Sequence, residues 1–194
     1  MAAGHPMLSG IVLAGGAGRR MGRPKGPVVV GGVAMAQAAA DLLRMHCDEV
    51  IVVGRRGIPL PPLDVPVYMD RPGPDAPLTG MATGLGATAC DDVIVLACDL
   101  PFAAPVVATL AAMPVGTAAV ACAHGRPQPL CARYPRVPAL AVADALLAAG
   151  RLPAMGLVRA LAAARVTVPD DVLLNLNTQD DLRAARRRWA AVMA

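Results

Sequence analysis

The 194-residue sequence has few aromatic residues, and its cysteines and histidines are not grouped. Phe, Trp and Tyr make up only 2% of the chain, which disfavours the aromatic platforms on which nucleic-acid bases stack. The five cysteines are an odd number without C-x-x-C spacing, and the three histidines, His5, His46 and His124, are isolated. Neither a disulfide framework nor a zinc site is therefore expected.

Lysine, asparagine, serine and glutamate are almost missing. Of the 18 basic residues, all but Lys25 are arginine, and of the 14 acidic residues all but one are aspartate. The chain has two asparagines, Asn175 and Asn177, and both lie near its end. Because the chain otherwise avoids these residue types, Lys25 and the two asparagines are candidates for a functional site.

The charge pattern and the apolar segments exclude several classes of protein. A net charge of +4 permits an anionic ligand but falls short of the clustered basic face typical of nucleic-acid binding. The start, MAAGHPMLSG, lacks the features of a secretory signal. The uncharged stretch 100–125 is interrupted by prolines and glycine, which predicts a helix followed by a buried strand rather than a membrane span. We expect a soluble cytoplasmic protein that binds neither nucleic acid nor membrane.

Apolar runs of strand length alternate with alanine-rich segments of helix length. The expected strands are 8–13, 49–53, 65–69, 92–97, 117–121, 130–134 and 172–176. The expected helices are 34–45, 78–89, 105–113, 137–149, 153–164 and 179–193. This alternation indicates crossover connections, and Gly31-Gly32 between apolar residues indicates a small hairpin. The sequence therefore predicts an α/β fold: a single Rossmann-like, three-layer domain over residues 1–194, with a mostly parallel central sheet flanked by helices.

A glycine-rich loop follows the first expected strand. In an open parallel sheet, ligands bind outside the carboxyl ends of the strands. Backbone N–H groups in residues 14–18 could approach a polyphosphate closely, with Arg20 and Lys25 supplying positive charge. The alternative is a tight turn with exposed basic residues. A Walker A loop is excluded, because no G-x-x-x-x-G-K-[ST] sequence occurs.

A dinucleotide-binding site is the main rival. Gly16, Gly18 and Gly22 give G-x-G-x-x-x-G, and Arg55 and Arg56 could meet the 2′-phosphate of NADP. The residue that reads the ribose lies about 20 positions beyond the glycines in that fold, but Gly18 and Arg55 are 37 positions apart. This spacing argues against an NADP-binding protein, which stays the second alternative.

Two aspartates stand at the ends of expected strands. Asp99 closes the run VIVLAC, and Asp70 follows strand 65–69. Mg²⁺ in nucleotidyl transfer prefers one or two carboxylates together with water and substrate oxygens, and Asp99 suits that role. The alternatives are that Asp99 caps the following helix and that Asp70 forms a turn.

Five motifs, in order along about 170 residues, resemble those of the MobA-type molybdenum cofactor guanylyltransferases, within the nucleotidyltransferase superfamily. They are LAGGAGRRMGRPKG (13–26), Asp70 with PLTGM (77–81), ACDLP (97–101), GRPQPLCARY (125–134) and LNLNTQDDL (174–182). Two positions depart from the pattern. Gly54 stands where many members carry an asparagine that contacts the nucleotide, so this contact is either missing or taken over by Arg55. Ala76 stands where glycine is usual.

The resemblance implies transfer of GMP from GTP to molybdopterin or the molybdenum cofactor, with Mg²⁺ as cofactor and pyrophosphate as leaving group. The nucleotide-binding positions that it implies are Leu13, Ala14, Gly15, Gly16, Lys25, Asp70, Gly80 and Asp99. Lys25 would contact the phosphates, Asp99 the metal, and Arg20 would join them as a catalytic residue. The attacking phosphate is already ionised, so no general base is needed. Proteins that deliver or accept the cofactor are the implied partners.

The last motif bears on the metal. On the expected strand 172–176 and its continuation, Asn175 and Asn177 would point to opposite faces, so that only one faces the site. Superfamily similarity favours Asn177 beside the metal, and the alternative is that Asn177 or Thr178 caps the final helix. Cytidylyltransferases and sugar-phosphate nucleotidyltransferases of the same fold remain alternatives, although LAGG, PLTG and NLNT resemble the guanylyl branch.

Overall fold

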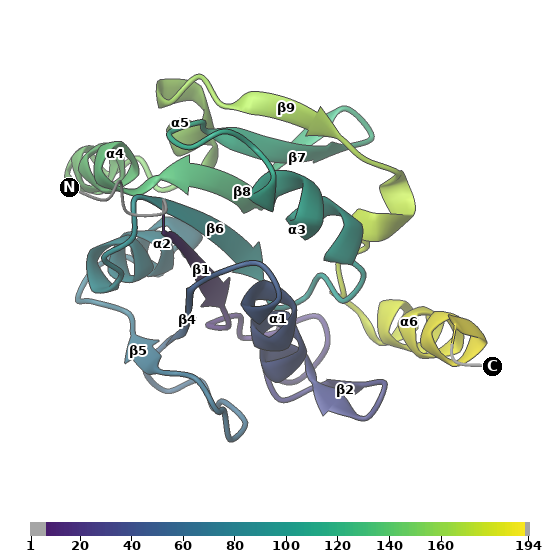
Figure 1. Cartoon of the computed structure of the whole chain (residues 1–194). Coiled ribbons are helices and arrows are strands. Elements are labelled where there is room, and N and C mark those ends of the chain that lie inside the picture. The colour runs from purple at the N-terminus through teal and green to yellow at the C-terminus, as the bar shows by residue number, and fades with distance from the viewer. Residues whose placement is uncertain (1–6, 193–194) are drawn as a thin grey trace.

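The computed structural model describes residues 7–192 and contains a seven-stranded sheet and a two-stranded hairpin (Figure 1). In spatial order the large sheet consists of β5 (Val67–Met69), β4 (Glu49–Gly54), β1 (Leu8–Leu13), β6 (Asp92–Ala97), β8 (Arg126–Pro135), β7 (Ala119–Ala123) and β9 (Ala164–Thr167). Strand β8 runs antiparallel to both neighbours, while the other pairings of this sheet are parallel. The predicted α/β class with a mostly parallel central sheet is confirmed.

Helices cover both faces of the sheet. Helices α1 (Met35–Arg44) and α3 (Ala104–Ala111) pack on one face. Helices α2 (Pro77–Ala87), α4 (Arg136–Ala148) and α5 (Met155–Ala160) pack on the other. Successive residues of one strand serve the two cores, since Val12 packs on the α1 side and Ile11 on the α2 side. The continuous apolar runs are therefore strands buried on both faces.

Helix α6 (Gln179–Val192) stands beside this three-layer body and packs on the hairpin (Figure 1). The hairpin pairs β2 (Val29–Val30) with β3 (Val33–Ala34), as predicted. Gly31 and Gly32 close it with φ angles of 62° and 85°, as a two-residue turn of this kind requires. Trp189 of α6 lies so close that a Cβ on Gly31 would sit 2.1 Å from its ring. The turn therefore needs glycine for both its conformation and its packing.

The boundaries of most elements follow the sequence pattern. Every expected helix is present, and six of the seven expected strands are present with boundaries shifted by a few residues. The uncharged stretch 100–125 forms α3 and the buried strand β7, as predicted. No helix within residues 7–192 has the length and apolarity needed to cross a bilayer. His5 and residue 193, the last position of the final expected helix, lie outside the described residues.

The predicted strand 172–176 is wrong, and strand β9 was not predicted. Residues 170–173 instead form a short 3₁₀ helix, η1 (Asp170–Leu173). Its apolar side chains, Val172 and Leu173, pack into the core beneath α1 and α3 and not on a sheet. Strand β9 falls at the end of the helix expected over 153–164. Helix α5 ends early at Ala160, and Ala162 reverses the chain with a φ of 47°. Residues 161–163, which were expected in the helix, instead connect α5 to β9, and β9 pairs in parallel with β7.

A buried ion pair joins the central strands to helix α3. The guanidinium of Arg133 on β8 donates to Asp92 Oδ2 on β6 through Nε (3.1 Å) and Nη2 (2.6 Å). Its Nη1 also donates to the carbonyl oxygens of Ala111 (2.8 Å) and Met113 (2.7 Å), at the C-terminal end of α3. Both charged side chains are almost fully buried. Removing either one would therefore leave the other buried without its counter-charge.

We expect Arg133→Met to lower the free energy of unfolding by about 3–5 kcal/mol, because Asp92 would remain buried and unpaired. Urea unfolding measures this loss. Arg71→Met, which removes the exposed pair between Arg71 and Asp144, is the matched control and should cost less than about 1 kcal/mol. Equal losses in the two variants would contradict this role for the buried pair.

Candidate functional site

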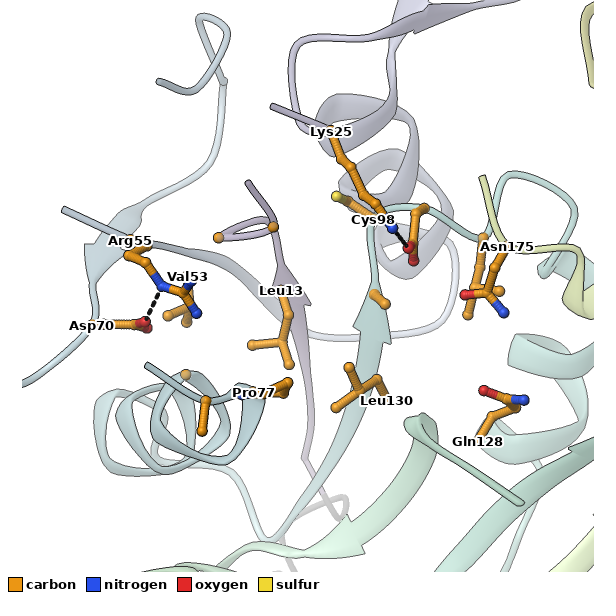
Figure 2. Close-up of a pocket in the computed structure, with 17 residues that line it drawn as sticks. Leu13, Lys25, Val53, Arg55, Asp70, Pro77, Cys98, Gln128, Leu130 and Asn175 are labelled. Atoms are coloured by element: carbon orange, nitrogen blue, oxygen red, sulfur yellow. Dashed lines mark hydrogen bonds and ion pairs between the residues drawn. The ribbon is translucent and has the colours of Figure 1, made fainter. Parts of the chain in front are cut away.

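A cavity of about 250 Å³ opens at the rim of the sheet where the parallel strands have their carboxyl ends (Figure 2). Its walls come from the loop after β1, the ends of β4 and β6, the first turn of α2, strand β8 and the segment before α6. In Figure 2, Arg55 and Asp70 lie on one side of the cavity, and Lys25, Cys98 and Asn175 on the other. This position agrees with the rule that open parallel sheets bind ligands at strand carboxyl ends.

The glycine loop folds back on itself and returns Lys25 to the cavity. The Lys25 N–H donates to the carbonyl oxygen of Gly16 (3.2 Å), and the Ala14 N–H donates to that of Val53 (2.8 Å). Gly18 has a φ of 58°, and a Cβ there would lie 1.9 Å from the carbonyl oxygen of Arg23. The loop can close only with glycine at this position, because any other side chain would collide with the backbone.

Lys25 connects three segments that are far apart in the sequence. Its ammonium donates to Asp99 Oδ2 at the end of β6 and to Asn177 Oδ1 before α6, the latter at 2.7 Å. The side chains of Lys25 and Asp99 are only 14% and 13% exposed. Asp99 does not cap helix α3, whose N-cap residue is Ala103, so the helix-cap alternative is wrong. We call the oxygens of Asp99 and Asn177 the cation cradle.

A capping box holds Asn177 in place. Asp181 Oδ2 accepts hydrogen bonds from the N–H groups of Asn177 (2.9 Å) and Thr178 (2.8 Å), and the Thr178 hydroxyl accepts from the Asp181 N–H (3.1 Å). The Leu176 N–H also donates to the carbonyl oxygen of Asp99 (3.0 Å). Thr178 therefore caps α6, whereas the side chain of Asn177 is free to face Lys25.

Both asparagines serve the same rim, which corrects the expectation that only one of them can face the site. Because residues 174–177 do not form a strand, strict alternation of side chains does not apply. Asn175 lines the cavity while Asn177 bonds the ammonium of Lys25 at its edge.

The cation cradle has the chemistry of a magnesium site. Asp99 Oδ1 is buried and has no hydrogen-bond partner among the described residues, so the burial of one carboxylate oxygen is left uncompensated. Mg²⁺ binds one or two protein oxygens of this kind and completes its shell with water and phosphate. Residues 7–192 contain no group of three His, Cys, Asp or Glu side chains that could hold a metal without such help. The residues present fit a metal that shares its coordination with a substrate.

The side of the cavity toward β4 carries a second pair of charges. Burial raises the pKa of Asp70, and the neighbouring Arg55 partly offsets this rise. Arg55 Nε lies 3.7 Å from Asp70 Oδ2, and its Nη1 pairs with Asp75. A Cβ on Gly80 would be 3.2 Å from Asp70 Oδ1, so α2 begins directly against this carboxylate.

The departure at residue 54 has a structural explanation. A Cβ on Gly54 would lie 2.7 Å from Cδ1 of Leu60, so Leu60 fills the space that a larger side chain would need. Arg55 lines the cavity instead and meets the carboxylates of Asp70 and Asp75.

The side of the cavity toward β8 was predicted from the sequence only as the motif GRPQPLCARY, without individual residues. Gln128 and Leu130 lie near the amino end of β8, which reaches the same rim because β8 runs antiparallel to its neighbours. With Asn175 they give this half one apolar and two amide side chains. The motif GRPQPLCARY contained the signal, but the direction of the strand could not be read from it.

The structure brings most, but not all, of the expected site residues together. The predicted nucleotide-binding positions that line the cavity are Leu13, Gly15, Gly16, Lys25, Asp70, Gly80 and Asp99. Ala14 is buried behind the loop, and Arg20 has an exposed side chain outside the lining. Arg20 stands instead near the first turn of α6, where it helps to lower the pKa of Asp181.

A larger hollow of about 520 Å³ lies between α1, α3 and α6. Its lining is mostly apolar, and among the described residues that line it only Asp41 and Arg188 are charged. Arg188 stacks on Phe102 with 4.1 Å between its Cζ and the ring centroid, and it also pairs with Asp171. The charges suited to phosphate and metal therefore gather in the smaller cavity.

Comparisons with known proteins agree with the geometry. The model of the MobA-like NTP transferase domain matches residues 10–168. A molybdenum cofactor guanylyltransferase from Cereibacter sphaeroides is 37% identical, over 92% of this chain and 95% of the relative. A probable molybdenum cofactor guanylyltransferase from Mycobacterium ulcerans is 35% identical, over 93% of this chain and 94% of the relative.

Solved structures share the fold. Molybdopterin-guanine dinucleotide biosynthesis protein A from Archaeoglobus fulgidus has a TM-score of 0.73 at 21% identity, covering 94% of this chain and 99% of that one. A nucleotidyl transferase from Methanothermobacter thermautotroptrophicus has a TM-score of 0.74 at 21% identity, covering 97% and 100% of the two chains.

We expect Asp181→Asn to destabilise the protein by about 0.5–1 kcal/mol at pH 7, because the capping box would lose its charged acceptor. Burial acts to raise the pKa of Asp181, but the hydrogen bonds from Asn177 and Thr178 and the charge of Arg20 bring the pKa below its ordinary value. The stabilisation is therefore complete above the unfolded-state pKa and is lost as the pH falls through the lower folded-state value.

Thermal unfolding of the wild type and of Asp181→Asn between pH 7 and pH 3 measures this dependence. The difference in stability should shrink at the acidic end of the series. A difference that stays constant over the whole range would show that the charge of Asp181 does not contribute.

Proposed function

Because the chain belongs to the MobA-like NTP transferase family, we propose that it transfers GMP from GTP to the molybdenum cofactor and that Mg²⁺ supports the transfer. The observation that carries the proposal is the contact of Lys25 with Asp99 and Asn177 at the sheet rim. Relatives named molybdenum cofactor guanylyltransferase match the chain over more than nine-tenths of its length. Family membership also favours nucleotidyl transfer over the NADP-binding alternative.

The nucleotide would enter between the glycine loop and the first turn of α2. Backbone groups of Leu13 and Gly15 line this half and can bond to the nucleotide without obstruction from long side chains. Asp70, held beside Arg55, offers carboxylate oxygens to the N–H or O–H donors of the nucleoside. The triphosphate would then extend toward Lys25.

Charge stabilisation at the α-phosphate would come from Lys25 and from the metal. The ammonium of Lys25 can follow the phosphate oxygens because its four-carbon side chain is flexible. Asp99 and Asn177 would hold Mg²⁺, which would supply positive charge to the phosphate oxygens and so favour in-line attack. Asp99 Oδ1 has no partner among the described residues, and the capping box holds the backbone of Asn177.

The reaction needs no side chain that removes a proton. An oxygen of the terminal phosphate of molybdopterin would form a bond to the α-phosphorus of GTP while the bond to the bridging oxygen breaks and pyrophosphate leaves. Since a phosphate oxygen is already ionised at neutral pH, a general base has no proton to take. Burial raises the pKa of the nearby Cys98 thiol strongly, so this thiol stays protonated and is no competing nucleophile.

The acceptor would occupy the half of the cavity toward β8. The nucleotide would fill the half beside Arg55 and Asp70, whereas Gln128, Leu130 and Asn175 line the other half (Figure 2). The amides of Gln128 and Asn175 can each donate and accept hydrogen bonds, which suits a pterin ring with mixed donors and acceptors along its edge. Leu130 supplies an apolar wall.

The function is tested by incubating the purified chain with Mg²⁺, molybdopterin or its molybdenum form, and either GTP or CTP. We expect pyrophosphate release and a guanine dinucleotide product with GTP. Release with CTP but not with GTP would assign the chain to the cytidylyl branch. NADPH binding without any pyrophosphate release would overturn the transferase assignment.

Lys25→Ala and Asp99→Ala should each lower turnover at least about a hundredfold, because each removes a charge that acts on the transferred phosphate. Pyrophosphate release under saturating GTP measures the effect, and circular dichroism checks the fold. Arg44→Ala, which removes an exposed ion pair on α1, is the control and should keep wild-type turnover. Near-normal turnover in either site variant would remove its residue from the mechanism.

Gln128→Leu should raise the KM for molybdopterin about three- to tenfold while the KM for GTP changes less than twofold, because the lost amide faces only the acceptor half. Initial rates with one substrate varied at a time separate the two constants. Gln37→Leu, on the far surface of α1, should change neither. A rise in the KM for GTP alone would place the acceptor elsewhere.

A further inference from the structure

The ammonium of Lys25 occupies the position that a metal ion would need. It binds both Asp99 Oδ2 and Asn177 Oδ1, which are oxygens from the two residues best suited to hold Mg²⁺. The aliphatic part of Lys25 lies against the glycine loop, since a Cβ on Gly16 would be 3.4 Å from its Cδ. A divalent cation cannot share the cradle with this ammonium, because like charges at such a distance repel.

The backbone that carries the cradle is held by hydrogen bonds that do not involve Lys25. The Leu176 N–H bonds to the Asp99 carbonyl oxygen at 3.0 Å, which ties the segment before α6 to the end of β6. Asp181 holds the Asn177 N–H at 2.9 Å and fixes that residue from the other side. Removing the ammonium would therefore leave the backbone of Asp99 and Asn177 in place, with the carboxylate of Asp99 uncompensated.

We propose that Lys25 acts as a tethered counter-ion that keeps the metal out of the cradle until GTP arrives. The proposal rests on the proposed function, which supplies the metal and the triphosphate. With Lys25 in place the pair of Lys25 and Asp99 is electrically neutral and attracts a free divalent cation weakly. When the nucleotide enters, its phosphates draw the ammonium away from Asp99, and the cradle becomes available to the metal.

The small number of protein ligands points to the same order of events. Within the described chain no cluster of three acidic, histidine or cysteine side chains exists to capture a metal ahead of the substrate. The free Oδ1 of Asp99 supplies one oxygen, and phosphate oxygens must supply others. Lys25 thus links two events, release of the cradle and neutralisation of the phosphates, and makes metal binding depend on the nucleotide.

The test uses Mn²⁺ as the probe and measures the disappearance of the free-ion signal by electron paramagnetic resonance, so that no turnover is involved. Without nucleotide, Lys25→Met should bind Mn²⁺ at least about tenfold more tightly than the wild type, because Asp99 loses its counter-ion. With a non-hydrolysable GTP analogue, Mn²⁺ binding to the wild type should become tight. Lys25→Arg, which keeps the charge, should bind the free ion as weakly as the wild type.

Two controls separate this effect from general loss of charge and from misfolding. Arg23→Met removes an exposed positive charge from the same loop and should leave Mn²⁺ affinity unchanged. Adding Asp99→Asn to Lys25→Met should abolish the gain, and thermal unfolding establishes that each variant is folded. Equal affinity of the wild type and Lys25→Met for the free ion would overturn the proposal. The assay of pyrophosphate release by the wild type tests the proposed function separately.

Discussion

The ammonium of Lys25 joins the glycine loop, the end of the central strand β6 and the segment that leads into α6. Lys25 and Asp99 are 13–14% exposed, and each would be costly to bury without the other. Backbone hydrogen bonds hold the three segments together. The carbonyl oxygen of Gly16 accepts from the Lys25 N–H, and that of Asp99 accepts from the Leu176 N–H. The contact therefore closes the sheet rim into a cavity, since the loop and the C-terminal segment come from opposite ends of the chain.

The direction of one strand decides what else reaches this cavity. Parallel strands bring their carboxyl ends to the rim, and with them Leu13, Gly54 and Ala97. Strand β8 runs the other way, so its amino end arrives there and carries Gln128 and Leu130. The cavity therefore has one side formed by the parallel strands and another formed by β8, an arrangement that a wholly parallel sheet would not produce from these segments.

The sequence allowed much of the fold and the centre of the site to be predicted. Buried strands gave continuous apolar runs, and the scarcity of lysine and asparagine singled out Lys25 and Asn177 before any contact was known. The secondary structure of residues 172–176 could not be predicted from the sequence. Burial of Val172 and Leu173 produces the same apolar pattern in a 3₁₀ helix as in a strand. Long-range geometry was equally hidden: Arg55 meets Asp75 through a loop whose path depends on tertiary packing, and Arg20 turns away toward α6.

A crystal structure with Mn²⁺ and a non-hydrolysable GTP analogue is the most direct test of the central claim, that the cation cradle is where metal and phosphate meet. Anomalous scattering would locate the ion without any assumption about the chemistry. We predict a Mn²⁺ peak in contact with the carboxylate of Asp99, and the ammonium of Lys25 moved from Asp99 onto the phosphates. A Mn²⁺ peak elsewhere, with the pair of Lys25 and Asp99 still intact beside the bound nucleotide, would contradict it.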